Sequence, residues 1–277
     1  MLRQKHEENM LISTIKKMKN NCPACSFLWE RLKQAGDFVA SRGVPAHIGA
    51  GGRFRLVFSY AFSDLVRNWG ERHNRGFEKW IKVCAGKKIV FDIGAHIGLY
   101  ALAASRVLNP EGVLFAYEPA GSNYGILQKH IRFNRLNNIK LFCQVVGAGE
   151  SAAVPFYETR VSSGMNYSFP PGKEGYVSVE REQVSIDSIS RRYGILPEVI
   201  KIDVEGNEAE VLKGAREVMT RCSPVLFLSL HPGLLSRRGD SAEAVAEILS
   251  ERGYRIYDMA GRPAGRLVHQ EYLVSKG

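Results

Sequence analysis

Two acidic residues each stand at or near the end of a short apolar run, and glycines follow the first of them. Asp92 precedes the segment Gly94-Ala95-His96-Ile97-Gly98, and Glu118 ends the apolar run at 113–117. Glycines at such a turn let a ligand approach the backbone closely, and a helix that starts there offers N–H groups to it. This spacing predicts a site for a nucleotide-type ligand.

The same residues argue against a dinucleotide. A nicotinamide fingerprint needs three glycines as G-x-G-x-x-G, and the run from Asp92 to Gly98 does not fit that pattern. A carboxylate in the turn would repel a pyrophosphate but suits the sulfonium and ammonium of S-adenosylmethionine. Glu118 can accept both hydroxyls of a ribose, a geometry shared with NAD sites. We therefore expect S-adenosylmethionine as the cofactor, with an NAD-dependent oxidoreductase as one alternative and a turn-capping role as the alternative for Asp92.

A second group of candidates follows two later apolar runs. Asp203 and Glu205 stand at the C-terminal end of the run at 198–204, and His231 comes after 224–230. Carboxyl ends of parallel strands meet at one edge of a sheet, so these side chains should face the same ligand. A hydroxyl acceptor benefits from a general base, which makes the three residues the candidate catalytic groups. Two carboxylates could instead bind the donor or Mg²⁺, but two ligands are a weak signal and no metal site is predicted.

Two further segments are candidates for ligand contacts. Gly147 and Ala148 follow the third predicted strand, where an adenine could lie against bare backbone. Polar and aromatic residues at 162–168 form a candidate substrate loop, with an ordinary solvent loop as the alternative.

Strands and helices that alternate along the chain must position these residues. Apolar runs predict strands at 53–60, 89–93, 113–117, 139–146, 198–204 and 224–230. Helical periodicity predicts helices at 99–108, 122–134, 207–221 and 240–252. Strands at 152–157 and 176–184 are expected in an insertion, and a hairpin at 254–257 and 267–274 is expected to finish the sheet. The pattern predicts a three-layer α/β domain.

The length of 277 residues suits either one large domain or one domain plus an appendage. Amphipathic patterns at 9–19 and 27–41 predict a mainly helical N-terminal extension over 1–75, ahead of a catalytic domain over 76–277. No apolar run is long enough to span a bilayer, and the polar first ten residues lack a secretory core, so we expect a cytoplasmic protein. Cys22 and Cys25 are close together, but no second pair follows at zinc spacing, which favours an incidental or structural pair.

The net charge of +10 is unevenly distributed. Residues 1–80 hold 14 Lys and Arg against 7 Asp and Glu, a net +7. Basic excess can indicate nucleic acid, anionic lipid or an acidic substrate. No dense run of Lys or Arg marks a nucleic-acid patch, so a solvated surface is favoured and an RNA methyltransferase remains a second alternative.

Four motifs resemble those of the FkbM-type methyltransferases. They are FDIGAHIGLYAL at 91–102, YEP at 117–119 with Asn123 and Asn134 downstream, VSIDSI at 184–189 and IKIDVEGNEAEVLKGA at 200–215. The resemblance covers about 76–231 and implies a class I, Rossmann-like fold with a mostly parallel sheet of seven strands.

The resemblance also implies S-adenosylmethionine as donor and a hydroxyl on a small molecule or glycan as acceptor. It places Asp92, Gly94 and Gly98 on the donor-binding motif and Glu118 on the ribose position. His96 stands where the family usually has asparagine. The predicted cofactor-binding residues are Asp92, Gly94, Ala95, His96, Gly98, Glu118, Asn123, Gly147 and Ala148.

Overall fold

The computed structural model describes residues 31, 36, 41–71, 74–160 and 165–277. The helix predicted at 9–19, most of that at 27–41, and the Cys22–Cys25 pair lie outside these residues. The first part of the predicted substrate loop, up to 164, lies outside them as well.

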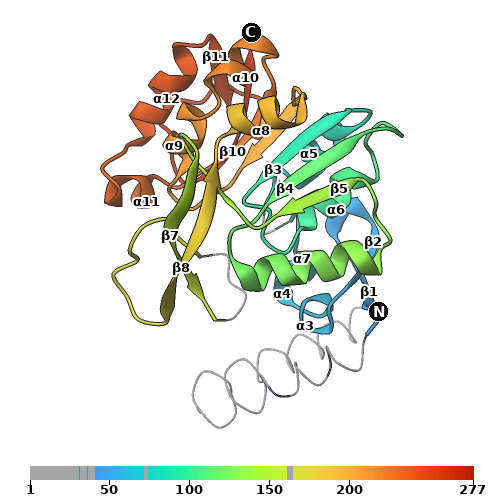
Figure 1. The fold of residues 1–277 in the computed structure, drawn as a ribbon. Coiled ribbons are helices and arrows are strands. Elements are labelled where there is room, and N and C mark those ends of the chain that lie inside the picture. Colours follow the sequence, from blue (N-terminus) through green and yellow to red (C-terminus); the bar gives the residue numbers. More distant parts are fainter. Residues whose placement is uncertain (1–30, 32–35, 37–40, 72–73, 161–164) are drawn as a thin grey trace.

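A seven-stranded sheet forms the middle of the fold (Figure 1). Its strands are β3 (Ile89–Ile93), β4 (Val113–Tyr117), β5 (Ile139–Phe142), β9 (Val199–Ile202), β10 (Val225–Leu230), β11 (Tyr254–Tyr257) and β12 (Gln270–Lys276). The order is β11-β12-β10-β9-β3-β4-β5, and β12 runs antiparallel to both of its neighbours while the other pairs are parallel. The chain order reverses between β9 and β3, the position where such sheets bind ligands at the strands' carboxyl ends. The predicted mostly parallel sheet of seven strands is confirmed.

Helices cover both faces of this sheet because successive strand residues point to opposite sides. Phe91 and Ile93 pack in one core with α8 (Ile186–Tyr193), α9 (Glu208–Lys213), α10 (Arg216–Arg221) and α12 (Ala242–Ser250). Val90 packs in the other core with α5 (Phe77–Cys84), α6 (Leu99–Ser105) and α7 (Gly121–Phe133). The predicted three-layer arrangement is therefore confirmed.

The single helix predicted over 207–221 is wrong, because the chain breaks between α9 and α10 at Gly214. A Cβ at Gly214 would lie 2.1 Å from the carbonyl oxygen of Gly147, so the backbones pass too closely for any side chain. After the break, the Asp187 carboxylate accepts the N–H groups of Glu217 and Val218 at the start of α10. Two contacts with distant segments thus shape this region: the close approach of Gly147 accompanies the end of α9, and the Asp187 carboxylate caps the start of α10.

The insertion forms a small sheet of its own. The two predicted strands are present as β7 (Ser151–Thr159) and β8 (Tyr176–Val184), which run antiparallel to each other, and the two-residue β6 (Val145–Val146) runs parallel to β8. The strand predicted at 139–146 is thereby divided between two sheets. Val146 and its neighbours consequently lie between the small sheet and the strand tips of the large one.

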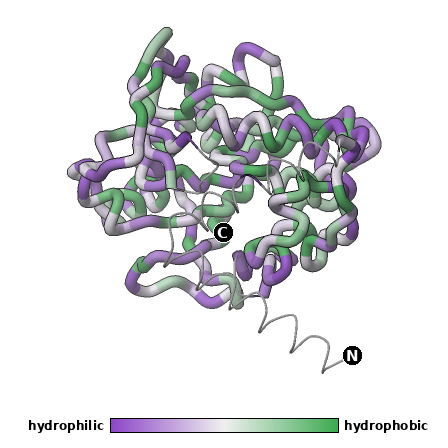
Figure 2. The backbone as a smooth tube through the Cα atoms, turned by 90° about the horizontal axis from the view of Figure 1, so that it is seen from below, coloured by the Kyte–Doolittle hydropathy of each residue, from purple (hydrophilic) through white to green (hydrophobic). Residues whose placement is uncertain are grey.

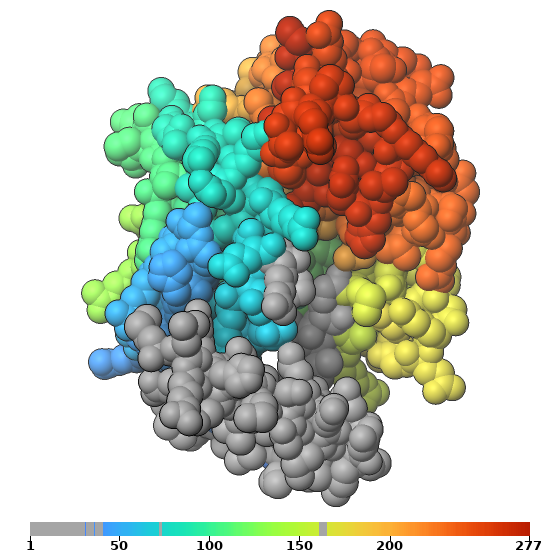
Figure 3. Space-filling view, turned by 180° about the vertical axis from the view of Figure 1, so that it is seen from behind, coloured from blue at the N-terminus to red at the C-terminus, as the bar shows by residue number. Residues whose placement is uncertain are grey.

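The described part of the N-terminal extension packs against the sheet domain. It contains the antiparallel hairpin of β1 (Val44–His47) and β2 (Arg53–Leu56), the turn η1 (Gly49–Gly51), and the short helices α3 (Phe58–Ala61) and α4 (Asp64–Arg67). Its side chains Ile48, Phe54 and Leu56 are buried in the core that also holds α5 and α6. In Figure 3 the residues just after it, in cyan, adjoin the C-terminal residues in red, and the Gly76 N–H donates to the Glu271 carboxylate there.

Hydrophilic stretches lie on every side of the outline in Figure 2. Within the described ranges, no helix has both the length and the apolar character that a membrane span requires.

Candidate active site

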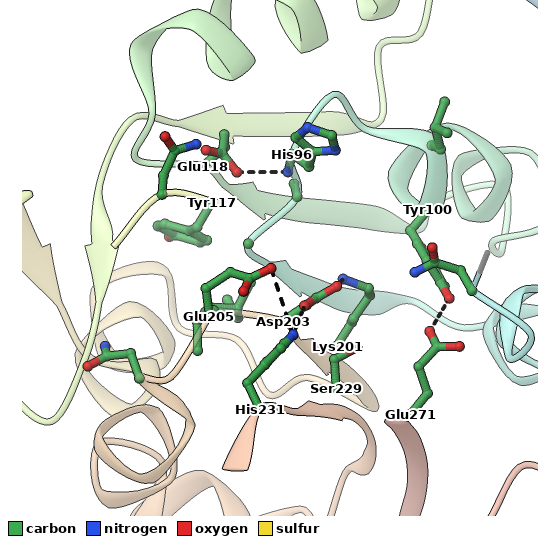
Figure 4. A pocket seen from close by; sticks show the side chains of 18 of the residues that line it. His96, Tyr100, Tyr117, Glu118, Lys201, Asp203, Glu205, Ser229, His231 and Glu271 are labelled. Atoms are coloured by element: carbon green, nitrogen blue, oxygen red, sulfur yellow. Dashed lines mark hydrogen bonds and ion pairs between the residues drawn. The ribbon is translucent and has the colours of Figure 1, made fainter. Parts of the chain in front are cut away.

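A cavity of about 1000 Å³ opens at the carboxyl ends of β3, β4, β9 and β10 (Figure 4). It brings together most of the residues that the sequence singled out. Those that line it are Gly94, Ala95, His96, Glu118, Asn123, Asp203, Glu205 and His231. Asn166 and Ser168, from the predicted substrate loop, line it too.

The structure does not bring Gly98, Gly147 and Ala148 to this cavity. Gly98 has φ +88°, and a Cβ there would lie 2.0 Å from a methyl carbon of Leu127. A glycine at this position therefore allows the start of α6 to pack closely against α7. Gly147 and Ala148 lie against Gly214. The predicted adenine contact at these two residues is not supported, because Gln144, Val145 and Val146 line the cavity in their place.

Asp92 also departs from its predicted position. It lies inside β3 rather than in the turn, is fully buried, and points to the same face as Val90. Its Oδ1 is 3.7 Å from the Nζ of Lys201, and burial raises the pKa of its carboxyl. The carboxylate therefore pairs with a buried ammonium, and it is not among the residues that line the cavity.

Most backbone N–H groups of the turn after β3 are hydrogen-bonded within the protein. Those of Gly94 and Ala95 both donate to the carbonyl oxygen of Tyr117, at 2.9 and 3.0 Å, and that of Gly98 donates to Ala95. A Cβ at Gly94, which has φ +81°, would lie 1.8 Å from the carbonyl oxygen of Asp203. The turn is therefore clamped between two neighbouring strands, and these N–H groups are not available to a phosphate.

Glu118 is fixed at the tip of β4, with only 4% of its surface exposed. Its carboxylate accepts the N–H groups of His96 (2.8 Å) and Ala120 (3.0 Å) and the side-chain amide of Asn123 (3.2 Å). Burial raises its pKa to about 7, although these hydrogen bonds favour the charged form. A carboxylate has roughly four lone-pair positions, so the capacity for about one more donor remains on the cavity side.

His96 adopts the left-handed conformation, with φ +52°. Burial lowers its pKa to about 4, so the ring is neutral at physiological pH. Its Nε2 is buried and has no hydrogen-bond partner among the described residues. An uncharged ring thus borders the cavity next to Glu118.

Asp203, Glu205 and His231 converge across the cavity from Glu118, as Figure 4 shows. The Nε2 of His231 lies 3.8 Å from Oδ1 of Asp203 and 3.7 Å from Oε1 of Glu205. Burial opposes a charge on His231, but the hydrogen bond to Glu208 and the nearby carboxylates raise its pKa to about 9. Burial raises the pKa of Glu205 to about 7 despite His231.

Lys201 is a buried residue of β9 that places a positive charge next to this cluster and pairs with Asp203, two residues later in the chain. Its Nζ is 3.0 Å from Oδ2 of Asp203. Burial opposes the ammonium, yet Asp203 and Asp92 raise its pKa. In return Lys201 is the main attraction that lowers the pKa of Asp203 against its own burial.

Sequence reasoning missed three residues of the site. Glu208 is fully buried, and its Oε1 lies 2.6 Å from Nδ1 of His231. In the sequence, only its position in the run EGNE pointed to a role in the site. The Tyr100 hydroxyl donates to Glu271 on the far wall. Nothing local marks Glu271, because β12 reaches the cavity only through the fold.

Known proteins with similar sequences are methyltransferases. Residues 92–256, more than half of the chain, match the family model described as the methyltransferase FkbM domain. The curated relatives include methyltransferase sdnD of Sordaria araneosa, 29% identical over 46% of this chain and 60% of the relative. Methyltransferase 1 of Beauveria bassiana (strain ARSEF 2860) is 24% identical over 45% of this chain and 57% of the relative. The chain thus spans about 60% of the length of the curated relatives it matches.

Among solved structures, a methyltransferase FkbM from Methylobacillus flagellatus KT is 21% identical, with a TM-score of 0.45, over 69% of this chain and 44% of that one. The matching family model is one of methyltransferases and not of oxidoreductases, and the class I methyltransferase fold expected from the motifs agrees with the observed sheet. The chain belongs to the FkbM methyltransferase family.

Proposed function

We propose that the protein transfers a methyl group from S-adenosylmethionine to a hydroxyl of a small molecule or glycan. The observation that carries the proposal is the pairing of Glu118 with a turn in which the N–H groups of Gly94, Ala95, His96 and Gly98 are already hydrogen-bonded within the protein. Such a site can bind a ribose hydroxyl but offers little to a pyrophosphate. This combination favours an adenosyl donor without phosphates.

The donor would lie across the tips of β3 and β4. Glu118 would accept one ribose hydroxyl, and the neutral His96 would border the donor's amino-acid end. Asp203 and Glu205 face the same cavity. Carboxylates near a sulfonium attract it, so the attraction that sequence reasoning assigned to Asp92 is assigned here to these two groups.

The acceptor hydroxyl would lie between the donor's methyl group and the acidic cluster. Its oxygen forms a bond to the methyl carbon while the carbon–sulfur bond breaks, and that electron pair stays on sulfur as a neutral thioether. The hydroxyl proton passes to a carboxylate. Glu205 is the best placed, because Asp203 is tied to Lys201 and His231 to Glu208. Holding oxygen, carbon and sulfur in line supplies much of the rate.

Calorimetry with S-adenosylhomocysteine tests the donor, and methyl-labelled donor tests the acceptor. We expect micromolar to millimolar binding that Glu118→Ala abolishes, and label transfer to hydroxyls in sugar or polyketide extracts. No binding of S-adenosylhomocysteine at about 1 mM would overturn the proposal. Label appearing only in RNA would transfer the assignment to the nucleic-acid alternative that the +10 charge leaves open.

A further inference from the structure

We propose that Asp203, Glu205 and His231 together bind one divalent cation at the wall of the cavity. One ligand atom from each lies within 4.8 Å of the others. The two distances from His231 Nε2, 3.8 and 3.7 Å, are too long for hydrogen bonds. Ligand atoms that each lie about 2.1 Å from one ion are about 3 to 4 Å from one another. The two separations from His231 therefore match the spacing of a coordination sphere.

The orientation of His231 provides an independent observation. Its Nδ1 lies 2.6 Å from Oε1 of Glu208, whose side chain is fully buried. The Nδ1–H therefore donates to Glu208, and Nε2 faces Asp203 and Glu205, where a bound ion would take the place of its proton. Histidines that bind metals almost always donate their other ring N–H to a carboxylate or carbonyl in this way. The His231 side chain is 9% exposed, and its Nε2 makes no hydrogen bond within the described part of the chain.

The local charge balance also favours a cation. Four carboxylates, those of Asp92, Asp203, Glu205 and Glu208, belong to the cluster or adjoin it, and in the described part of the chain they are in contact with two basic groups, Lys201 and His231. Lys201 occupies Oδ2 of Asp203, which leaves Oδ1 to face the cluster. A protonated His231 would offset one negative charge, whereas a divalent ion offsets two and also uses the open lone pairs.

The backbone at Glu205 adopts an unfavourable conformation, and a cation site would explain why it is kept. Glu205 adopts φ +50° and Gly206 follows with φ +96°, so a residue with a side chain is held in the left-handed region. Backbone outliers of this kind persist mainly where a function uses them. Here the turn presents the Glu205 carboxylate to the cavity beside Asp203.

The chemical types of the three ligand atoms indicate which ions the site would prefer. An imidazole together with two carboxylates suits Mn²⁺, Fe²⁺ or Zn²⁺ better than Mg²⁺ or Ca²⁺, which prefer oxygen alone. The role of the ion, unlike the site, rests on the proposed function. In that role the ion binds the acceptor's hydroxyl oxygen and lowers the hydroxyl's pKa. The second oxygen of Glu205 then remains open to take the proton.

Titration of the chelator-treated full chain with Mn²⁺, followed by the electron paramagnetic resonance of the free ion, tests the site. We expect one bound Mn²⁺ per chain, displaced by Zn²⁺. Glu205→Gln should weaken binding at least about tenfold. Glu210→Gln is the matched control, since Glu210 pairs with Lys213 outside the cavity and its loss should leave binding unchanged. Thermal unfolding of both variants checks that they are folded.

The inference is overturned if no stoichiometric Mn²⁺ binding occurs below about 1 mM, or if Glu205→Gln binds as tightly as Glu210→Gln. The second result would indicate adventitious surface binding only. Calorimetry of the metal-free chain with S-adenosylhomocysteine separates this failure from that of the proposed function. Donor binding without Mn²⁺ binding removes the cation alone, whereas Mn²⁺ binding without donor binding keeps the site and removes the methyl donor.

Discussion

At the scale of single residues, Glu118 links donor binding to pH. Burial raises the pKa of its carboxyl to about 7, and a ribose hydroxyl donates best to the ionised form. Protonation as the pH falls should therefore weaken S-adenosylhomocysteine binding, by about tenfold for each unit well below pH 7. Calorimetry from about pH 8 to about pH 5 measures this slope.

Glu118→Gln is the control for this slope, because an amide keeps the shape but does not titrate. Its binding should be weaker at high pH and less dependent on pH than that of the natural chain. A natural chain whose affinity stays level across this range would show that the ribose does not depend on the ionised Glu118.

His96 carries a second prediction, based on its backbone. Its φ of +52° lies in the left-handed region, which asparagine adopts more readily than most residues. Because the ring is neutral and its Nε2 unpartnered in the described structure, His96→Asn should keep the free energy of unfolding within about 1 kcal/mol and preserve S-adenosylhomocysteine binding. His96→Val should instead cost about 1 to 2 kcal/mol, since a β-branched residue is strained there. Urea denaturation compares the two, and equal losses would contradict the backbone argument.

Asp92 and Glu118 show what residue patterns can and cannot predict. Glu118 ends its strand and reaches the cavity, as expected from its position alone. Asp92 lies within a strand buried on both faces, where apolar residues on each side hide the alternation. The face to which it points could not be read from such a run, and neither could its partner Lys201, which is 109 positions later in the chain and adjacent only through strand pairing.

At the scale of elements, the turn between β3 and α6 should tolerate no side chain at Gly94. A Cβ there would lie 1.8 Å from the backbone oxygen of Asp203, which cannot move without displacing the tip of β9. Gly86 has a similar φ of +72° but open space around its Cβ position. Gly86→Ala should therefore show the cost of backbone strain alone, about 1 kcal/mol.

Gly94→Ala should cost clearly more than Gly86→Ala, by about 1 to 3 kcal/mol, and should also weaken S-adenosylhomocysteine binding. Chemical denaturation and calorimetry of the two variants measure both effects. If the two variants lose the same stability, the close approach of the two strand tips does not constrain the turn.

Elements with a strong period in the sequence were predictable, and those decided by distant contacts were not. The alternating insertion strands β7 and β8 and the parallel strands of the large sheet follow the apolar pattern. The break at Gly214 does not, because its cause is the backbone of Gly147 in another element. β1 was missed as well, since Pro45 and its short length give it no clear alternation.

At the scale of the whole molecule, the family match begins at Asp92 and ends at 256, yet the cavity extends beyond it. Asn74 and Arg75 before the match, and Asp258, Met259 and Glu271 among the residues after it, also line the cavity. We therefore expect acceptor selectivity to depend on them, while the motif residues determine the donor.

The last prediction concerns the boundary placed at residue 75. The side chain of Leu56 is fully buried in the core that holds α6, and the adjacent Val57 N–H donates to His130, whose Nδ1–H in turn donates to the carbonyl of Ile97 in the turn. Leu56→Ala should therefore lower the free energy of unfolding of the whole domain by about 2 to 5 kcal/mol in one cooperative transition. Arg53→Ala, an exposed change on the same strand, should stay within about 0.5 kcal/mol.

Denaturation followed by both tryptophan fluorescence and far-ultraviolet circular dichroism measures these changes. Coincident transitions in the Leu56→Ala variant would mean that the hairpin and the sheet domain unfold together, because they share one core. A separate early transition, or a loss as small as that of Arg53→Ala, would instead support an extension that folds apart from residues 76–277. The distinction matters for the site, since α6 and the donor turn are supported from the side that the hairpin covers.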